Sequence, residues 1–379
     1  MILKYMSTQI ESYHNKSQSI MDYNFQDIEG ERFICINALE TIPTFFVSMI
    51  SAQDHWFFTA TNGALSAGRG SPGNSLFPYY TVDKIINNSN CTGPQTIIKV
   101  ANRVWEPFNP SSERIFSISR KIYKSINGDT LIFEEINQDL ELKFSFTWST
   151  SEKYGFIRRS RLVNLSTDDT EITLIDGVSD FLASGVDDRT HLAYSCLTDA
   201  YKVSELELSN QLLVHRMVAS LVDEAIPLEC LKATVLWSYG WDDASVLIQQ
   251  SDVEQFLNDP SFQGSNFSRG LRGCYYNSGS FQIRSNGVKS WSIVADIDKT
   301  QSEVAELYIA LKDKDALWQS VIEDITEGKN ALEELIQASD GLQICSEEIV
   351  STHHRANVLF NIMRGGVFPD NYSISKNLL

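Results

Sequence analysis

The 379-residue sequence lacks the features that would place it in a membrane or in an oxidising compartment. Its six cysteines are scattered without C-x-x-C or another paired spacing, which is typical of free thiols in a reducing compartment. No apolar run reaches the roughly 18 residues of a membrane-spanning helix, and the first residues hold no apolar run of signal-peptide length. We therefore expect a cytoplasmic protein that spans no membrane.

Basic residues are also scarce. The chain carries 31 Lys and Arg against 49 Asp and Glu, which gives a formal net charge of −18 at pH 7. Such an acidic surface repels the phosphate backbone of nucleic acids, so we expect no nucleic-acid partner. A neutral ligand, such as a sugar, is compatible with this charge.

Strong catalytic signatures are missing as well. The sequence contains no HExxH, no GxSxG, no P-loop and no Rossmann glycine pattern. Residues 68–73, GRGSPG, look like a glycine-rich phosphate loop, but they lack the Lys-Ser or Lys-Thr pair and the helix that such a loop needs. We expect no metal and no cofactor.

What the sequence does contain is a long region of two-residue period, which is typical of β-strands and extends to about residue 300. In residues 140–148, LELKFSFTW, apolar side chains occupy every second position. Because so many antiparallel strands cannot remain one flat sheet, we expect two twisted sheets packed together. Further strands are predicted at 115–116, 131–133, 156–165, 171–175, 202–208, 231–237, 281–283 and 289–294. Separating turns are predicted at 127–129, 166–169, 278–279 and 286–287.

After residue 300 the apolar period changes to that of a helix. Residues 304–311 form one apolar stripe, and residues 317–336 form a second that ends at Ser339-Asp340-Gly341. A third helix is predicted from about residue 346 to Met363, closed by Gly365-Gly366. The chain is therefore predicted to be mainly β, with helices at its C-terminal end.

Histidines and carboxylates supply weak candidates for sugar chemistry. His55 and His191 lie near predicted turns, where each could act on a sugar hydroxyl or serve the structure alone. His353 and His354 are adjacent, so they point to different sides of a helix and do not share a metal. Carboxylate pairs of the kind that glycosidases use, with turn formation as the alternative, occur at Asp176 and Asp180, at 187–188 and at 242–243.

Aromatic residues form the more suggestive groups. They lie at 79–80, at 105–108 and at 237–241. Aromatic faces stack on the apolar faces of sugar rings, while neighbouring polar side chains bond the hydroxyls. The same rings could instead plug the open edge of a β-sandwich, and the sequence leaves both interpretations open.

The order of several motifs resembles one protein family. In combination they are similar to the N-terminal part of large bacterial glycoside phosphorylases, of the cellobiose and chitobiose phosphorylase family. The motifs are HWFFTATNGALSAGRGSPGNSLFPYYTVDKI at 55–85, TGP at 92–94, VWEPF at 104–108, LIDGVSDFLASGVD at 174–187 and NVLFNIMRGGVFPDN at 357–371.

This resemblance implies an antiparallel β-supersandwich of the galactose mutarotase type, followed by a helical linker. It divides the chain into an N-terminal extension with the first strand (1–40), the supersandwich (41–300), linker helices (301–345) and a helix that leads into an (α/α)6 barrel (346–379). In the family, the catalytic Asp lies in the barrel. Inorganic phosphate, the co-substrate, attacks the glycosidic bond there. We expect no such barrel within these 379 residues.

The resemblance thus implies a carbohydrate-binding domain for β-linked oligosaccharides that is not catalytic alone. Its implied partner is a barrel domain or subunit, and a homodimer is a further alternative. A stand-alone aldose-epimerase-like enzyme, with His191 and either Asp176 or Asp187, and a non-catalytic scaffold remain as other functions. The resemblance points to Arg69, Tyr79, Tyr80 and Asp83 as substrate-binding residues and to Asn361 and Arg364 at the barrel interface, and the aromatic argument adds Trp105 and Trp241.

Overall fold

The fold is given by a computed structural model that describes residues 22–89, 91–186, 188–219, 231–339 and 342–363. Strands dominate up to residue 300 and helices follow, so the predicted mainly antiparallel β fold with C-terminal helices is confirmed. Among these residues, no helix combines the length and the hydropathy that crossing a membrane requires.

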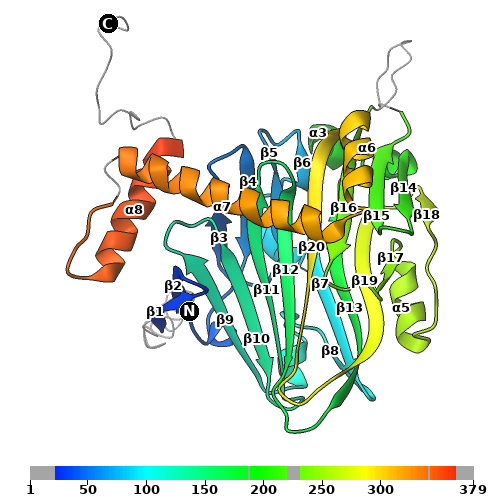
Figure 1. Ribbon diagram of the computed structural model, residues 1–379, viewed down its shortest axis with the longest axis horizontal. Helices are drawn as coiled ribbons and strands as arrows, with labels where there is room; N and C mark the ends of the chain where they lie inside the picture. The colour runs from blue at the N-terminus through cyan, green and yellow to red at the C-terminus, as the bar shows by residue number, and fades with distance from the viewer. Residues whose placement is uncertain (1–21, 90, 187, 220–230, 340–341, 364–379) are drawn as a thin grey trace, which may run out of the picture.

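The largest layer is an eleven-stranded antiparallel sheet (Figure 1). Most neighbours in the sheet are consecutive in the sequence, but β2 pairs with β9, and β20 lies between β12 and β16 at the centre of the sheet. In spatial order the strands are β1 (Tyr23–Ile28), β2 (Glu31–Ile36), β9 (Ile118–Ser125), β10 (Leu131–Asn137), β11 (Leu142–Ser151), β12 (Gly155–Asn164), β20 (Val288–Thr300), β16 (Lys232–Tyr239), β15 (Leu212–Met217), β14 (Lys202–Glu207) and β18 (Phe267–Arg269).

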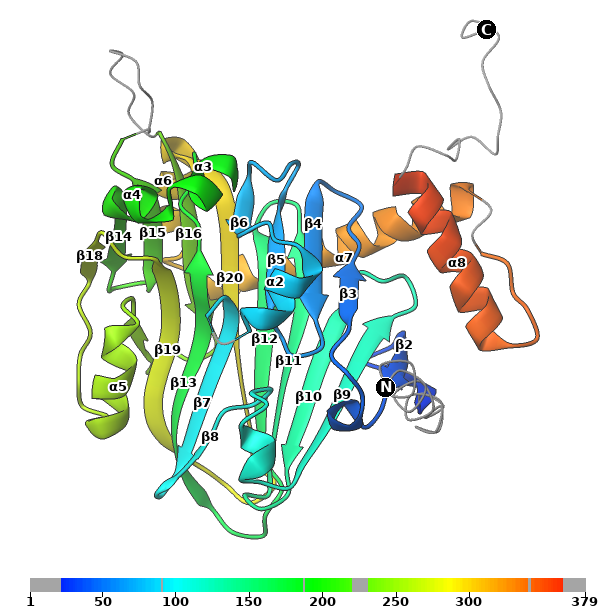
Figure 2. The ribbon, with the colours of Figure 1, turned by 180° about the vertical axis from the view of Figure 1, so that it is seen from behind.

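Two smaller sheets pack against one face of the large sheet (Figure 2). The two-sheet expectation therefore missed one sheet. The five-stranded sheet contains β17 (Ser245–Leu247), β19 (Gly273–Ile283), β13 (Thr170–Phe181), β7 (Gly93–Val100) and β8 (Arg103–Trp105), and the four-stranded sheet contains β3 (Phe46–Met49), β4 (His55–Ala60), β5 (Leu65–Arg69) and β6 (Ser75–Phe77).

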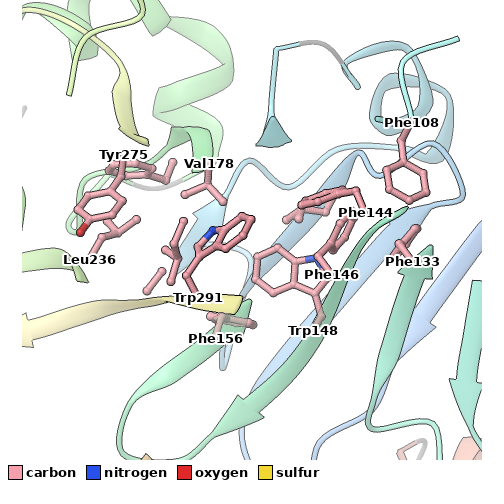
Figure 3. Close-up of a cluster of buried hydrophobic side chains, with 14 of the residues drawn as sticks. Phe108, Phe133, Phe144, Phe146, Trp148, Phe156, Val178, Leu236, Tyr275 and Trp291 are labelled. Carbon is pink, nitrogen blue, oxygen red and sulfur yellow. The ribbon is translucent and has the colours of Figure 1, made fainter. Parts of the chain in front are cut away.

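The main core lies between these layers and is rich in aromatic rings (Figure 3). Phe133 and Phe146 stack with their ring centroids 4.8 Å apart. Trp148 of the large sheet meets Phe57 of the four-stranded sheet at 5.3 Å. Such rings bury large apolar areas, so this core supplies much of the driving force that holds three sheets together.

Helices cover the opposite face of the large sheet. Helix α6 (Gln301–Ala310) starts directly after β20 with a capping box between Thr300 and Glu303. Helix α7 (Lys314–Ala338) lies across β11, β12 and β20, and α8 (Glu348–Met363) packs near its far end (Figure 1). Short helices connect the strands: α2 (Val82–Asn87), α3 (Asp188–Ala193), α4 (Ser195–Ala200), α5 (Ser251–Asn258) and the 3-10 turns η1 (Leu39–Thr41) and η2 (Ser112–Arg114).

Most predicted strands and all three predicted helices are confirmed, but one turn prediction and one strand prediction are wrong. Residues 278–279 lie inside β19, where a Cβ at Gly279 would lie 2.9 Å from the Trp241 ring, so this glycine serves close packing within the strand. The turns at 166–169 and 286–287 are confirmed, although they connect strands of different sheets. Residues 115–116, which were predicted as a strand, instead form a turn after η2. Gly365-Gly366, predicted to close the third helix, lies outside the described residues.

The stretch around GRGSPG is more ordered than the sequence suggested. It contains the end of β5, a turn, β6 and then α2, so no helix follows the glycines directly and that part of the argument against a phosphate loop is confirmed. A Cβ at Gly68 would lie 2.4 Å from the Trp56 ring and 2.5 Å from the Asn74 carbonyl oxygen. This glycine therefore serves close packing and not a phosphate.

Candidate functional site

A buried carboxylate holds the loop that carries the VWEPF motif. Glu135 on β10 accepts hydrogen bonds of 2.6 Å from the Trp105 indole, the Phe108 backbone N–H and the Arg120 guanidinium. Burial raises the pKa of Glu135, and these three donors oppose that rise. The loop from Trp105 to Asn109 is thereby fixed to the large sheet.

Phe108 has an unusual backbone conformation in this loop. Its φ is 64°, in the left-handed region that bulky side chains rarely adopt. Its ring packs edge-on against Phe133 and Phe146, at 5.7 and 5.3 Å, which helps to hold the conformation (Figure 3). Backbone strain of this kind concentrates at binding and catalytic sites, which makes the loop a functional candidate.

The loop forms one wall of a cleft of about 600 Å³, a volume in the range of small-molecule sites. The other walls come from the turn after β4, from β7 and from α5, which lie on the face shown in Figure 2. We call it the Glu106 cleft. Its lining is Asn62, Gly63, Ser89, Pro94, Gln95, Thr96, Ile97, Glu106, Pro107, Phe108, Asn109, Phe146, Gln250, Ser251, Val253, Glu254 and Leu257.

A buried ion pair supports the floor of this cleft. Arg158 donates to Asp176 at 2.7 Å, and neither side chain is exposed. Thr96, a floor residue, donates to the other oxygen of Asp176 at 2.6 Å, and the Trp291 indole donates at 2.6 Å. The Arg158 guanidinium also lies 4.6 Å from the ring centre of Phe146. Asp176 is therefore a structural carboxylate of the core and not half of an accessible catalytic pair.

The charge in the cleft has one sign. Glu106 and Glu254 line it, and none of the described lining residues is Lys or Arg. Glu106 accepts a hydrogen bond of 2.6 Å from the Asn109 amide. The Tyr276 hydroxyl lies 2.6 and 2.7 Å from the side-chain oxygens of Gln95 and Gln250, which fixes both amides at the cleft wall. This arrangement suits ligand hydroxyls and opposes anions.

Two predicted ligand-binding tryptophans belong to the core. Trp105 is fully buried, and its indole N–H is used by Glu135. Trp241 is 4% exposed and packs against Trp291 and Phe281. Neither ring offers a face to a ligand, so the substrate-binding role predicted for both is wrong. The other interpretation, core packing, describes Trp105 and Trp241, because both rings belong to the main core between the sheets.

Arg69 lies in a second cleft, of about 620 Å³, below α6; we call it the Arg69 cleft. Its guanidinium donates to Asp54 at 3.0 Å and to both oxygens of Asp296 at 3.1 and 3.2 Å. Lys299 also pairs with Asp296, at 2.6 Å. The donors of Arg69 are thus largely occupied by the protein itself.

The remaining predicted residues line neither cleft. Tyr79 is 42% exposed, with its ring edge against Trp56, whereas half-buried Tyr80 packs against the small cluster under α2. Lys84 lies over the Tyr80 ring rather than pairing with Asp83, whose pKa is lowered by a hydrogen bond with Thr81. Ligand binding by the two tyrosines and Asp83 stays a prediction.

The C-terminal and histidine predictions have mixed outcomes. Asn361 lies exposed on α8, and Arg364 falls outside the described residues, as does Asp187. The charged groups around His191 are Lys202, Asp180, Asp199 and Arg272, so the structure does not bring His191 together with Asp176. Burial, followed by the nearby Arg69 guanidinium, lowers the pKa of His55 to about 4.

Sequence reasoning missed the polar residues of the Glu106 cleft. Glu106 lies inside the quoted VWEPF motif and Asn109 follows it, so attention to polar residues beside Pro107 could have found them. Gln95, Gln250 and Glu254 carry no signal in the sequence, because only tertiary packing brings α5 beside β7.

No family profile and no curated protein sequence matches this chain. Solved structures with a similar fold include a protein from the human microbiome assigned as a kojibiose phosphorylase, with 12% identity and a TM-score of 0.44 over 70% of this chain and 30% of that one. A bacterial glucoamylase in complex with acarbose has 12% identity and a TM-score of 0.43, over 85% of this chain and 43% of that one.

A galactose mutarotase-like protein from Clostridium acetobutylicum has 8% identity and a TM-score of 0.36, over 74% of this chain and 99% of that one. The chain thus spans less than half of the length of the phosphorylase and the glucoamylase. The likeness concerns fold alone at these identities, and no family membership follows from it.

Proposed function

We propose that this chain is a carbohydrate-binding domain and that the Glu106 cleft takes an oligosaccharide. The observation that carries the proposal is the lining: carboxylates and amides at the walls, Pro94, Pro107 and Phe108 beside them, and no basic side chain among the described lining residues. Polyols are bound by such a mixture of apolar surface and convergent hydrogen-bonding groups. Anionic ligands are disfavoured by the two carboxylates.

Isothermal titration tests the proposal with cellotriose and other β-linked oligosaccharides. Ser251 is exposed at the start of α5 and lines the cleft, so Ser251→Trp should fill the cleft and abolish binding. Gln255→Trp is the matched control, because that exposed residue lies on the same helix outside the lining. Absence of binding by every saccharide tried, or equal binding by both variants, would overturn the proposal.

We further propose that the domain acts within a glycoside phosphorylase-like system on β-linked oligosaccharides and is not catalytic alone. Apolar residues exposed on the C-terminal helices support a partner there, since Ile309 on α6 is 61% exposed and Phe360 on α8 is 50% exposed. A helical-barrel domain or subunit is the proposed partner, and inorganic phosphate would react there. Cytoplasmic location is supported by the free thiols of all five described cysteines.

Co-purification with a separately expressed barrel from a glycoside phosphorylase tests the partner. Association that is lost in the Ile309→Ser and Phe360→Ser variants is the expected result. A second copy of this chain on the same surface, which is the scaffold alternative, would appear as a dimer in light scattering and would argue against the barrel.

A further inference from the structure

The carboxylates of the Glu106 cleft differ from three carboxylates elsewhere in the described residues that pair with basic side chains. In the Arg69 cleft, Asp54 and Asp296 pair with Arg69, and Asp296 also pairs with Lys299. In the core, Asp176 pairs with Arg158. None of the ion pairs among the described residues includes Glu106 or Glu254, although Glu106 lies in a loop that Trp105 and Phe108 hold by two hydrogen bonds to Glu135.

The basic residue closest in sequence to the cleft floor is also committed elsewhere. Lys99 lies on β7, three positions after Thr96, and its ammonium group donates to the Leu257 carbonyl at 2.8 Å. That carbonyl belongs to the last turn of α5, where a cation is favoured by the helix dipole. Lys99 is not among the residues that line the cleft, so the negative charge there is not balanced from within.

We propose that the ligand supplies the missing cation, and that the Glu106 cleft prefers an amino-oligosaccharide with free ammonium groups over a neutral one. This inference rests on the proposed function and narrows its substrate class. Glu106 from the loop and Glu254 from α5 stand on different walls of one cleft, so both can contact a single bound sugar chain. The amides of the cleft then contact the hydroxyls of the sugar, and the prolines contact its ring faces. These contacts are the same for a neutral saccharide.

The experiment compares two trisaccharides that differ only at position 2 of each ring. The β-1,4-linked glucosamine trimer carries ammonium groups there, whereas cellotriose carries hydroxyls. In isothermal titration at low salt, with the amines protonated, the glucosamine trimer should bind at least roughly fivefold more tightly than cellotriose. This is the gain in affinity that one or two exposed charge pairs supply. The preference should shrink in 0.5 M salt, which screens such pairs.

Variants assign the preference to the two carboxylates. Glu106→Gln and Glu254→Gln should each reduce binding of the glucosamine trimer more than binding of cellotriose, so that the preference for the trimer shrinks in each variant. Glu327→Gln is the control, because it removes the same charge from an exposed position of α7, on the opposite face of the large sheet. It should leave both affinities unchanged.

The outcomes separate this inference from the function on which it rests. Equal binding of both trisaccharides, or a preference that survives in both Gln variants, overturns the cation preference and leaves carbohydrate binding intact. If neither trisaccharide binds, the proposed function fails with it. Binding of calcium alone that competes with the trimer would show that the carboxylates form a metal site instead and would also overturn the inference.

Discussion

The two clefts have nearly the same volume but differ in how their carboxylates are paired. In the Arg69 cleft, Asp296 is only 2% exposed and pairs with both Arg69 and Lys299. In the Glu106 cleft, Glu106 and Glu254 have no basic partner among the lining residues. The difference indicates that the first charge set serves folding and that the second is available to a ligand.

Burial explains why Asp296 in the Arg69 cleft needs cationic partners. A carboxylate removed from water is tolerated only with cations and hydrogen-bond donors around it. Burial raises the pKa of Asp296, while Lys299 and Arg69 act against that rise. Glu106 and Glu254 retain contact with water, so no such requirement applies to them.

The largest effect should come from breaking the charge balance of the Arg69 cleft. Asp296→Ala removes the shared acceptor of Arg69 and Lys299, and we expect a loss of about 3 kcal/mol in the free energy of unfolding. Asp54→Ala removes a half-exposed partner of Arg69 and should cost less than about 1 kcal/mol. Urea denaturation measures the free energy of unfolding of both variants. Similar losses in the two variants would contradict the conclusion that Asp296 matters more to the fold than Asp54.

A smaller effect is expected where the Glu106 cleft depends on a buried carboxylate of its own. Glu135→Gln weakens the bonds to Trp105, Phe108 and Arg120, and it should lower the free energy of unfolding by about 2 kcal/mol. Saccharide affinity should fall with it, because the loop loses its anchor. Glu134→Gln, on the same strand and partly exposed, is the control. Unchanged affinity in a folded Glu135→Gln protein would show that this anchor does not shape the cleft.

The smallest effect is a pH dependence from the histidine beside the Arg69 cleft. In the folded protein the pKa of His55 is about 4, below its ordinary value of 6.5. Between these two pH values the unfolded chain binds a proton at His55 and the folded chain does not. Stability is therefore lost as pH falls from 6.5 towards 4, by about 1 kcal/mol at pH 5.5 relative to pH 7. His55→Asn should flatten this part of the urea stability profile, and an identical slope would contradict the assignment.

Local sequence patterns predicted where strands and helices lie better than they predicted which strands belong to the same sheet. Alternation at 140–148 located β11, and the change of period near residue 300 located the β20–α6 junction. The third sheet was missed, because its strands β3 to β6 are only three to six residues long and no strand was predicted there. Turn signals at 166–169 and 286–287 marked chain reversals correctly, yet nothing local says that the chain changes sheets there.

The candidate site shows the same limit. The VWEPF motif lies in the loop that lines the Glu106 cleft, but the predicted Trp105 anchors that loop, whereas Glu106 lines the cleft. Which neighbour points inward depends on Glu135, which is 29 positions away from Glu106 in the sequence and hydrogen-bonds the loop from β10.

By itself, the sequence determined the acidic character, the β region and the helices that follow it, because composition and apolar periodicity are local properties. Only the tertiary structure decided which charges are paired within the protein and which stay in contact with water. Arg69 and Asp296 are 227 positions apart, and Glu106 and Glu254 are 148 apart. Whether such distant charges meet a partner or water depends on how the sheets pack, which no short stretch of sequence encodes.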